Sequence, residues 1–430
     1  MKKQQTTSIN TVKYAILGCT ILVNLVLIVF NNQEVFELFA GDSDSFFTAF
    51  YNFQKLGFYN GCANGYGLLY FGSVSFFFSL TDNINQSFFW VNFLSQIAIV
   101  IVALKTIWFF KSKSSLYYFL SLFTLLATQT INLKSYTSAY NDTFLGVFVV
   151  LILYVFITKI IFDFDNKYHF LKLGVLLAIA LSIRETTIAL GLSCLFGIVY
   201  LKFANSISWQ LVGKNLLFAI IPFIILTSML HYPSLKEHNK LCFYDKNPKV
   251  GANWVQRNFL GLTKIKNGQE TVHRDAIWAR TKFDAVNEYL AKNGHDALPR
   301  TLFKAFLQDP VLVSSIFGYN IIYSILFTIR FYGLIFLYIA FLFFSKRQFI
   351  ASNVLFFMTL FFYSFLSFVC FTFIETRWFV GYEVLVPLSF LLAANKFNFI
   401  KQSRRLDVVF IISLVLVSSF NLISISKIIF

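Results

Sequence analysis

The chain has 430 residues, of which 57% are hydrophobic and 13% are charged, and its formal net charge is +16. Soluble domains carry about 25% charged residues, so this composition excludes a water-facing globule of the same size. Many Lys and Arg residues lie in short clusters between apolar runs, where positive charge orients membrane helices. We therefore interpret the positive charge as a topology signal and expect no binding of nucleic acid.

Eleven apolar runs predict membrane-spanning helices, of which the two that flank Arg184 are short. The first run follows Met1-Lys2-Lys3 and has no small-residue cleavage site, so it predicts a retained helix rather than a removed signal peptide. The runs lie near residues 14–31, 87–110, 116–132, 143–162, 170–183, 186–201, 215–231, 325–345, 350–373, 378–394 and 407–427. The sequence thus predicts an all-α polytopic membrane protein.

Positive charge alternates between the short loops that join these runs. The short loops of one set hold only Lys134, Arg184 and Arg377, whereas the other set holds the basic clusters. Because Lys- and Arg-rich loops stay on the cytoplasmic side, the N-terminus is expected inside and the C-terminus outside. The side with few positive charges is called the outer side below.

Two loops on the outer side are long, and the second is the only substantial polar stretch of the chain. Its mixed charges and short periodic segments predict a small folded cap. The expected divisions are an N-terminal transmembrane module at 1–231, which includes the first outer loop at 32–86, then the cap loop at 232–324 and the C-terminal transmembrane helices at 325–430.

The segment after Asp44 has the pattern of an amphipathic helix. At about 100° per residue, its polar and aromatic residues separate onto two faces. The polar face holds Ser45, Thr48, Asn52 and Lys55, and the aromatic face holds Phe46, Phe47, Phe50 and Phe53. Such a helix is expected to lie in the membrane interface with its Phe face in lipid or against other helices. This helix either only covers the outer face of the helix bundle or helps to form a functional site.

Two carboxylates, Asp42 and Asp44, stand just outside the first predicted helix, in Gly41-Asp42-Ser43-Asp44. Partial burial beside a second charge suits one of them to general-base catalysis. The alternative is a solvated helix cap formed by Ser43 or Asp44. Asp-x-Asp is also a metal motif of enzymes that use nucleotide sugars, but those donors are cytosolic and this motif is predicted outside.

Further ionisable residues fall on the same predicted outer side. They are Asp142, Arg184, Glu185, Glu375 and Arg377. Arg offers a fixed fork of donors for phosphate oxygens, and carboxylates accept hydrogen bonds from sugar hydroxyls. Such a layer at a lipid interface suits a lipid phosphate that carries a polar group. A simpler interpretation of the neighbours Arg184 and Glu185 is a pair that neutralises itself.

Four other residues on the predicted outer side have roles that the sequence does not decide. Arg330, about one turn inside the eighth run, either snorkels to the surface or reaches a lipid headgroup. His231 is expected at a solvated helix end. Cys62 and Cys242 lie in the two outer loops, so they are either bridged, if that side is oxidising, or free. The spacing of Cys and His matches no metal site.

Three motifs resemble the GT-C superfamily of integral membrane glycosyltransferases, which includes protein mannosyltransferase-like and aminoarabinose transferase-like members. The segment from Gly41-Asp42-Ser43-Asp44 to Leu56-Gly57-Phe58 is similar to the first outer loop of that family. The helix from Leu173-Gly174 to Arg184-Glu185 resembles its Gly-containing helix, and Glu375-Thr376-Arg377-Trp378 resembles its late Glu-x-Arg-Tyr segment. Gln308-Asp309-Pro310 is a weaker match to an Asn-Pro pair that often precedes a late helix in that family. Trp378 replaces the usual Tyr.

The resemblance implies a GT-C-like bundle of about eleven transmembrane helices, with interfacial helices in the first outer loop and a small outer cap. It implies an enzyme that moves a sugar from a polyprenyl-phosphate donor to an acceptor hydroxyl with inversion, without a metal or other cofactor. Asp44 or Asp42 is the expected base. The expected donor-binding residues are Arg377, Arg184, Glu375, Asp142, Glu185 and Arg330.

The acceptor is expected to be a glycan, a lipid or a protein, and the expected location is a bacterial inner membrane with the site facing the periplasm or exterior. The first alternative is a polymerase or ligase of lipid-linked polysaccharide, which relies on outer Arg and His residues. A transporter fits less well, because its ionisable residues are expected near mid-membrane. A non-catalytic scaffold is the remaining alternative.

Overall fold

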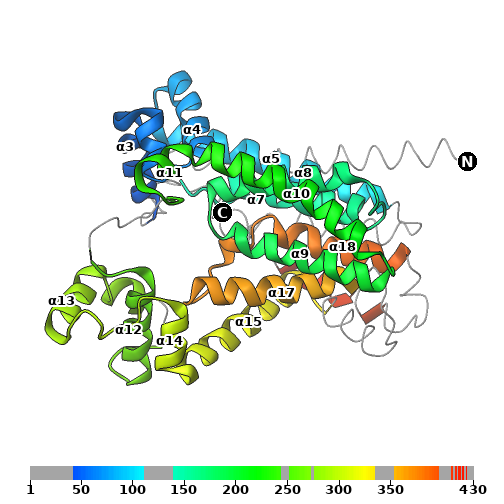
Figure 1. Ribbon diagram of the computed structural model, residues 1–430. Coiled ribbons are helices and arrows are strands. Elements are labelled where there is room, and N and C mark those ends of the chain that lie inside the picture. Colours follow the sequence, from blue (N-terminus) through cyan, green and yellow to red (C-terminus); the bar gives the residue numbers. More distant parts are fainter. Residues whose placement is uncertain are drawn as a thin grey trace, which may run out of the picture. The chain divides into compact units, whose positions relative to one another are not determined.

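The computed structural model describes residues 42–110, 139–243, 251–272, 276–334 and 353–396, with short pieces between 408 and 423 (Figure 1). The regular elements in these ranges are helices, and no strand occurs among them. The predicted all-α class is therefore confirmed for the described part of the chain. The runs predicted near 14–31 and 116–132, and most of 407–427, lie outside it.

Six helices in the described ranges are long and apolar enough to cross a membrane. They are α5 (Ile84–Phe110), α7 (Asp142–Val155) with its π-helical continuation η1 (Phe156–Ile160), α9 (Thr187–Ala204), α10 (Trp209–Leu230), α15 (Pro310–Tyr332) and α17 (Asn353–Cys370). By the length and composition of these helices, the chain is a membrane protein. Each of the six overlaps one of the predicted apolar runs.

The chain divides into two compact units, which are described separately. The first contains Met1–Tyr244, Thr328–Thr359 and Thr376–Phe430, and the second contains Asp245–Phe327 and Leu360–Glu375. Besides α5, α7, η1, α9, α10 and parts of α15 and α17, the first unit holds α3 (Asp42–Ala63), α4 (Leu68–Thr81), α8 (Lys167–Ile183), α11 (Tyr232–His238), η3 (Thr376–Phe379) and α18 (Tyr382–Lys396).

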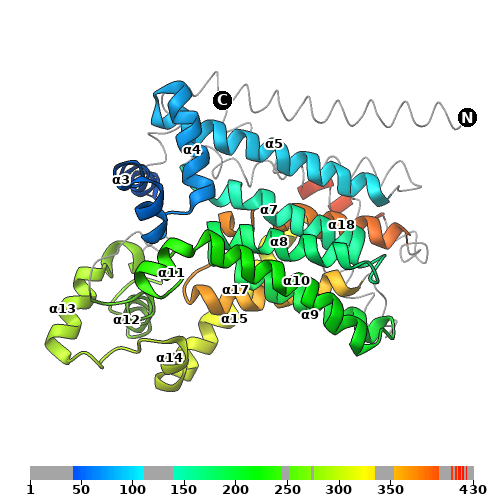
Figure 2. The same ribbon diagram turned by 45° about the horizontal axis from the view of Figure 1, so that its top comes forward.

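In the first unit, α5, α7, α8 and α10 lie side by side, as both views show (Figures 1 and 2). The helices α8 and α10 are in close contact at Gly174, where an added Cβ would overlap the main chain of Ala219. Small residues at such crossings let membrane helices pack backbone to backbone. Helix α9 packs against α17, where the Ser193 hydroxyl donates to the Met358 carbonyl oxygen over 2.7 Å.

Replacing Gly174 with Ala is expected to lower the stability of the protein, because the new methyl group forces α8 away from Ala219. Overpacking of this kind costs about 1–3 kcal/mol. The matched control is Gly213→Ala in α10, where an added Cβ meets nothing within 4 Å. Thermal unfolding of the detergent-solubilised protein checks this, and equal midpoints for both variants would show that the α8–α10 contact is looser than described.

The helix predicted after Asp44 is present as the first part of α3, which bends at Gly57 with a φ of 75°. Its two faces are as expected: Phe46, Phe50 and Phe53 are buried, whereas polar residues such as Asn52 are exposed. The Phe face packs against protein, because these rings share one core with Tyr70 and Phe88. The first outer loop therefore folds onto the helices through aromatic contacts.

The second unit holds α12 (Trp254–Lys266), η2 (Ala276–Arg280), α13 (Phe283–Asn293) and α14 (Leu302–Gln308), and it includes residues of α15 and α17. A core that contains Phe259, Ile277, Val286 and Leu312 joins these elements. Asn253 begins α12 with a capping box, in which its side chain and that of Gln256 satisfy each other's main-chain N–H groups.

The start of α15 differs from the prediction. The apolar run was expected near 325, whereas α15 begins at Pro310. Asp309 provides the physical reason, because its Oδ1 accepts a hydrogen bond from the Leu312 N–H over 2.9 Å and so caps the helix ahead of a proline that suits the first turn. The Lys266 ammonium, 2.5 Å away, holds the pKa of Asp309 below its usual value. Arg330 consequently lies in the last turn of α15 rather than near the beginning of the helix.

Candidate functional site

The first turn of α3 lies beside the segment that leads into α7. The main-chain N–H of Ala139 donates to the Ser43 hydroxyl over 3.4 Å, and the Tyr70 hydroxyl donates to the Ala139 carbonyl oxygen over 2.9 Å. The rings of Phe46 and Tyr140 stand 6.0 Å apart. These contacts place the helix that carries the two predicted carboxylates next to the N-terminus of α7.

Asp142 is the first residue of α7, and its side chain is only 3% exposed. The guanidinium group of Arg184 donates to its Oδ1, and Arg377 Nε lies 3.8 Å from its Oδ2. Asn141 also joins the beginning of α7 to the end of α8, because its side-chain amide donates to the Ile183 carbonyl oxygen over 3.1 Å. One buried carboxylate therefore joins three segments that are far apart in the sequence.

Two aromatic rings complete this arrangement. The guanidinium carbon of Arg377 lies 4.2 Å from the centre of the Tyr140 ring, and that of Arg184 lies 5.7 Å from the centre of the Trp378 ring. The two Arg side chains are 12% and 20% exposed. Rings beneath the guanidinium groups add cation–π attraction and limit their motion. We call Asp142, Arg184, Arg377, Tyr140 and Trp378 the Asp142 cluster.

The Asp142 cluster carries a net positive charge, because two guanidinium groups face one carboxylate. Charges in a partly buried site interact more strongly than in water. Arginine donors also match phosphate oxygens in geometry. The cluster is therefore chemically suited to hold an anion such as a phosphate group at the edge of the helix bundle.

The structure brings together only part of the predicted outer layer. Asp142, Arg184 and Arg377 meet, as described. Glu185 is exposed in the turn between α8 and α9, so the interpretation of Arg184 and Glu185 as a self-neutralising pair is wrong: Arg184 bonds to Asp142 instead. Glu375 belongs to the second unit and is half-buried.

The two carboxylates of the first loop lie at the beginning of α3. Asp42 opens the helix, and Asp44 is its third residue, with an exposed side chain. The expected partial burial is therefore not found for Asp44. Capping by Ser43 is also wrong, because Ser43 is a helical residue whose hydroxyl bonds to Ala139. A carboxylate in the first turn interacts favourably with the helix N-terminus.

Other expectations are corrected or resolved by the structure. His231 ends α10 but is buried, with its ring 5.1 Å from that of Phe243, so its interpretation as a solvated helix end is wrong. Burial lowers the pKa of His231.

Cys62 and Cys242 are both free thiols. Among the described residues, no group of three or more His, Cys, Asp or Glu side chains is placed to hold a metal.

Glu383 is a buried carboxyl that the sequence interpretation missed. It lies in the first turn of α18 and is 3% exposed, and neither carboxyl oxygen has a hydrogen-bond partner in the described part of the chain. The Tyr332 hydroxyl donates to its main-chain oxygen. An ionisable residue within a predicted apolar run is a functional candidate, and that signal was present in the run near 378–394.

Replacing Asp142 with Asn is expected to destabilise the protein by about 3–5 kcal/mol, because it leaves two partly buried guanidinium groups without their counter-charge. The matched control is Asp163→Asn. The Asp163 side chain is 55% exposed and pairs with His169, so its loss is expected to cost less than about 1 kcal/mol. Denaturant unfolding in detergent measures both, and equal losses would contradict the buried role of Asp142.

Comparisons of the chain with protein-family models, with curated proteins and with solved structures found no match.

Proposed function

We propose that the chain is a membrane glycosyltransferase that moves a sugar from a polyprenyl-phosphate donor to an acceptor hydroxyl with inversion. The observation that carries this proposal is the Asp142 cluster, a positively charged corner beside the first turn of α3. Arginine donors that suit a phosphate and a carboxylate that can act as a base are the two components that such a transfer needs. The resemblance of the first-loop and late motifs to GT-C enzymes supports the same reaction.

In this proposal, Arg377 and Arg184 bind the phosphate of the donor. The leaving group is a lipid phosphate, which needs stabilisation of its negative charge more than it needs a proton. Asp142 keeps both guanidinium groups at one place and lowers their mutual repulsion. Glu375 and Glu185 are proposed as further donor-binding residues on the strength of their motifs alone. The expectation that Arg330 binds the donor is given up, because Arg330 lies in the last turn of α15, at the end of the helix opposite Pro310.

Asp44 or Asp42 is the proposed general base. The carboxylate takes the proton of the acceptor hydroxyl, the hydroxyl oxygen forms a bond to the anomeric carbon, and the bond from that carbon to the phosphate oxygen breaks. The hydroxyl oxygen attacks from the side opposite the phosphate, which leaves with the bonding electrons, so the configuration inverts. One carboxylate is sufficient for this step, in contrast to the pair that hydrolases use. The exposure of Asp44 leaves its carboxylate open to an incoming acceptor.

The proposal places the site on the outer face of a bacterial inner membrane, in a GT-C-like bundle of about eleven helices. Lipid-borne donors are available on that side, whereas nucleotide sugars are cytosolic. The acceptor is proposed to be a glycan, a lipid or a protein. No metal or other cofactor is part of the proposed reaction.

A transfer assay in proteoliposomes tests the proposed function. The full chain is supplied in parallel with polyprenyl-phosphate sugars and with the corresponding nucleotide sugars, and glycosylated products are separated by chromatography. We expect transfer from at least one lipid-phosphate sugar and none from the nucleotide sugars. Transfer from nucleotide sugars alone would contradict the proposed donor.

A polymerase or ligase of lipid-linked polysaccharide is the second candidate. The two arginines of the Asp142 cluster favour it as well, because they would suit any lipid-borne anion. The two candidates differ in their use of the first loop, since only the transferase needs Asp42 or Asp44. Substitution of Asp42 and Asp44 by Asn therefore separates the two candidate functions.

A further inference from the structure

Three large apolar side chains of α14 in the second unit are exposed. Phe303 is 70% exposed and Leu307 is 65% exposed, and Phe306, which stands between them in the sequence, is exposed as well. At about 100° per residue, these three residues fall within about 100° of the helix circumference. One face of α14 is therefore both apolar and exposed.

The opposite face of α14 already packs into the second unit. Ala305 is buried in the core that contains Phe259 and Leu312, and Leu302 packs against the same core. The exposed residues consequently form a second apolar face rather than the edge of the first. A contiguous exposed patch of this kind marks a site of contact with a membrane or with another protein.

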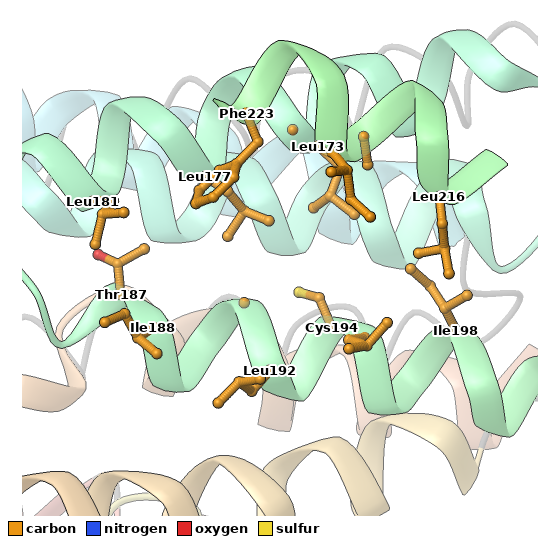
Figure 3. A pocket seen from close by; sticks show the side chains of 15 residues that line it. Leu173, Leu177, Leu181, Thr187, Ile188, Leu192, Cys194, Ile198, Leu216 and Phe223 are labelled. Carbon is orange, nitrogen blue, oxygen red and sulfur yellow. The ribbon is translucent and has the colours of Figure 1, made fainter. Parts of the chain in front are cut away.

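Apolar surface in the first unit has a simpler explanation. Figure 3 shows an apolar groove between α8, α9 and α10, whose volume is about 280 Å³ and whose lining contains one oxygen-bearing side chain, that of Thr187. The helices α9 and α10 are long enough to cross a membrane, and a spanning helix is expected to present apolar side chains to lipid. The seven residues of α14 extend over about 10 Å, so α14 cannot span a bilayer and its exposed face needs another cause.

The position of α14 in the chain brings it to the surface of the bilayer. Helix α14 ends at Gln308 and the apolar helix α15 begins at Pro310, so Asp309 alone stands between them. The 23 residues of α15 extend over about 34 Å, which is close to the ~30 Å hydrocarbon thickness of a bilayer. A bilayer that α15 crosses therefore has one boundary near Pro310, directly beside α14.

An exposed stripe on α15 leads to the same point. Tyr319, Ile322 and Leu326 are exposed at intervals of three and four residues, which is the pattern of a helix with one face in lipid. Val311, in the first turn of α15, falls on the same stripe and is exposed too. Lipid that covers this stripe therefore reaches the end of α15 that joins α14.

The charges around α14 suit the headgroups of a bilayer. Arg300 and Lys304 are both exposed, one just before α14 and the other within it. Asp309 is the only acidic residue between 300 and 334, and the Lys266 ammonium 2.5 Å away neutralises it. The remaining positive charge attracts anionic lipids, and long basic side chains can reach from an apolar surface to lipid phosphates.

We propose that α14 lies in the interface of the bilayer, with Phe303, Phe306 and Leu307 among the acyl-chain carbons next to the headgroups. Arg300 and Lys304 contact the lipid phosphates. The partner of this face is the lipid surface, because α15 brings that surface to α14. The second unit, whose polar sequence predicted an outer cap, is thereby anchored to the membrane along α14. This anchor does not depend on the proposed sugar transfer.

The test uses the full chain in nanodiscs of phosphatidylcholine and phosphatidylglycerol. A fluorescent dansyl amino acid replaces Phe303, Leu307 or Ile322, one at a time, and nitroxide groups at shallow or deep acyl carbons of the lipids quench its fluorescence. We expect the labels at positions 303 and 307 to lie about 5–10 Å inside the boundary of headgroups and acyl chains, which is the depth of interfacial helices. The label at position 322 is expected to be quenched most strongly by the deep nitroxide.

Tyr289 is the matched control position, because it is exposed and aromatic and belongs to α13, which lies on the far side of α12 from α15 in both views (Figures 1 and 2). A label there is expected to respond to acrylamide in the water and not to the lipid nitroxides. Equal access of acrylamide to positions 303, 307 and 289 would overturn the inference. Shielding of positions 303 and 307 from both acrylamide and the nitroxides would overturn it as well, because protein would then cover this face. The assay contains no sugar donor, so its outcome is independent of the proposed transfer.

Discussion

Replacing Asp44 or Asp42 with Asn is expected to lower the rate of sugar transfer by about 10²–10⁴-fold for whichever residue is the base, which is the usual contribution of a general base. Asn keeps the size of the side chain but cannot take the acceptor's proton. Donor binding is expected to change little, because the phosphate contacts are assigned to Arg377 and Arg184. Initial rates in proteoliposomes measure the effect, with donor binding determined in parallel.

Asp82→Asn is the matched control for these variants. Asp82 lies in the same outer loop, is exposed and adopts a left-handed conformation with a φ of 49°, which Asn also accepts readily. This control is expected to transfer sugar at the wild-type rate. Wild-type rates for both Asp44→Asn and Asp42→Asn would eliminate the proposed base and leave the polysaccharide polymerase or ligase as the better candidate.

Replacing Arg377 with Gln is expected to lower the rate constant for transfer by about 10²–10³-fold, the effect of removing one preorganised donor from a developing negative charge. Arg377→Lys keeps the charge but loses the planar fork of donors, so an intermediate loss is expected. The kinetics of the reconstituted protein separate kcat from KM. An interaction made mainly in the transition state lowers kcat and kcat/KM together.

The control for Arg377 is Arg280→Gln in the second unit. The Arg280 side chain is 59% exposed and pairs with Glu270, so its loss is expected to leave both kinetic constants unchanged. Unfolding midpoints of the two Arg377 variants show how much of any loss is structural. If Arg377→Gln stays folded and transfers sugar at the wild-type rate, Arg377 does not stabilise the leaving phosphate.

The features that sequence alone predicted well are those with a local cause. The division of α3 into a buried Phe face and an exposed polar face follows from the helical period, as Phe50 and Asn52 illustrate. The long apolar helices follow from composition and length. Alternating loop charge predicted that Asp142, Arg184 and Arg377 belong to one layer, and the structure brings these three residues into one cluster.

The features that sequence reasoning missed depend on tertiary packing or on competing local signals. Arg184 bonds to Asp142 rather than to its neighbour Glu185 because the packing of α7 against α8 brings the two ends together. The early start of α15 depends on the cap that Asp309 provides, a local signal that competes with the later onset of the apolar run near 325. Glu383 was hidden within an apolar run, where hydropathy averages over a single carboxyl group.

The proposed transfer releases a lipid monophosphate, which can be followed together with the transferred sugar. The full chain in proteoliposomes is given a polyprenyl-phosphate sugar that is labelled in both the sugar and the lipid, together with an acceptor that supports transfer. We expect polyprenyl monophosphate to appear in step with the glycosylated acceptor and the transferred sugar to have the inverted anomeric configuration. Retention of configuration, or transfer of the sugar without release of the lipid monophosphate, would contradict it.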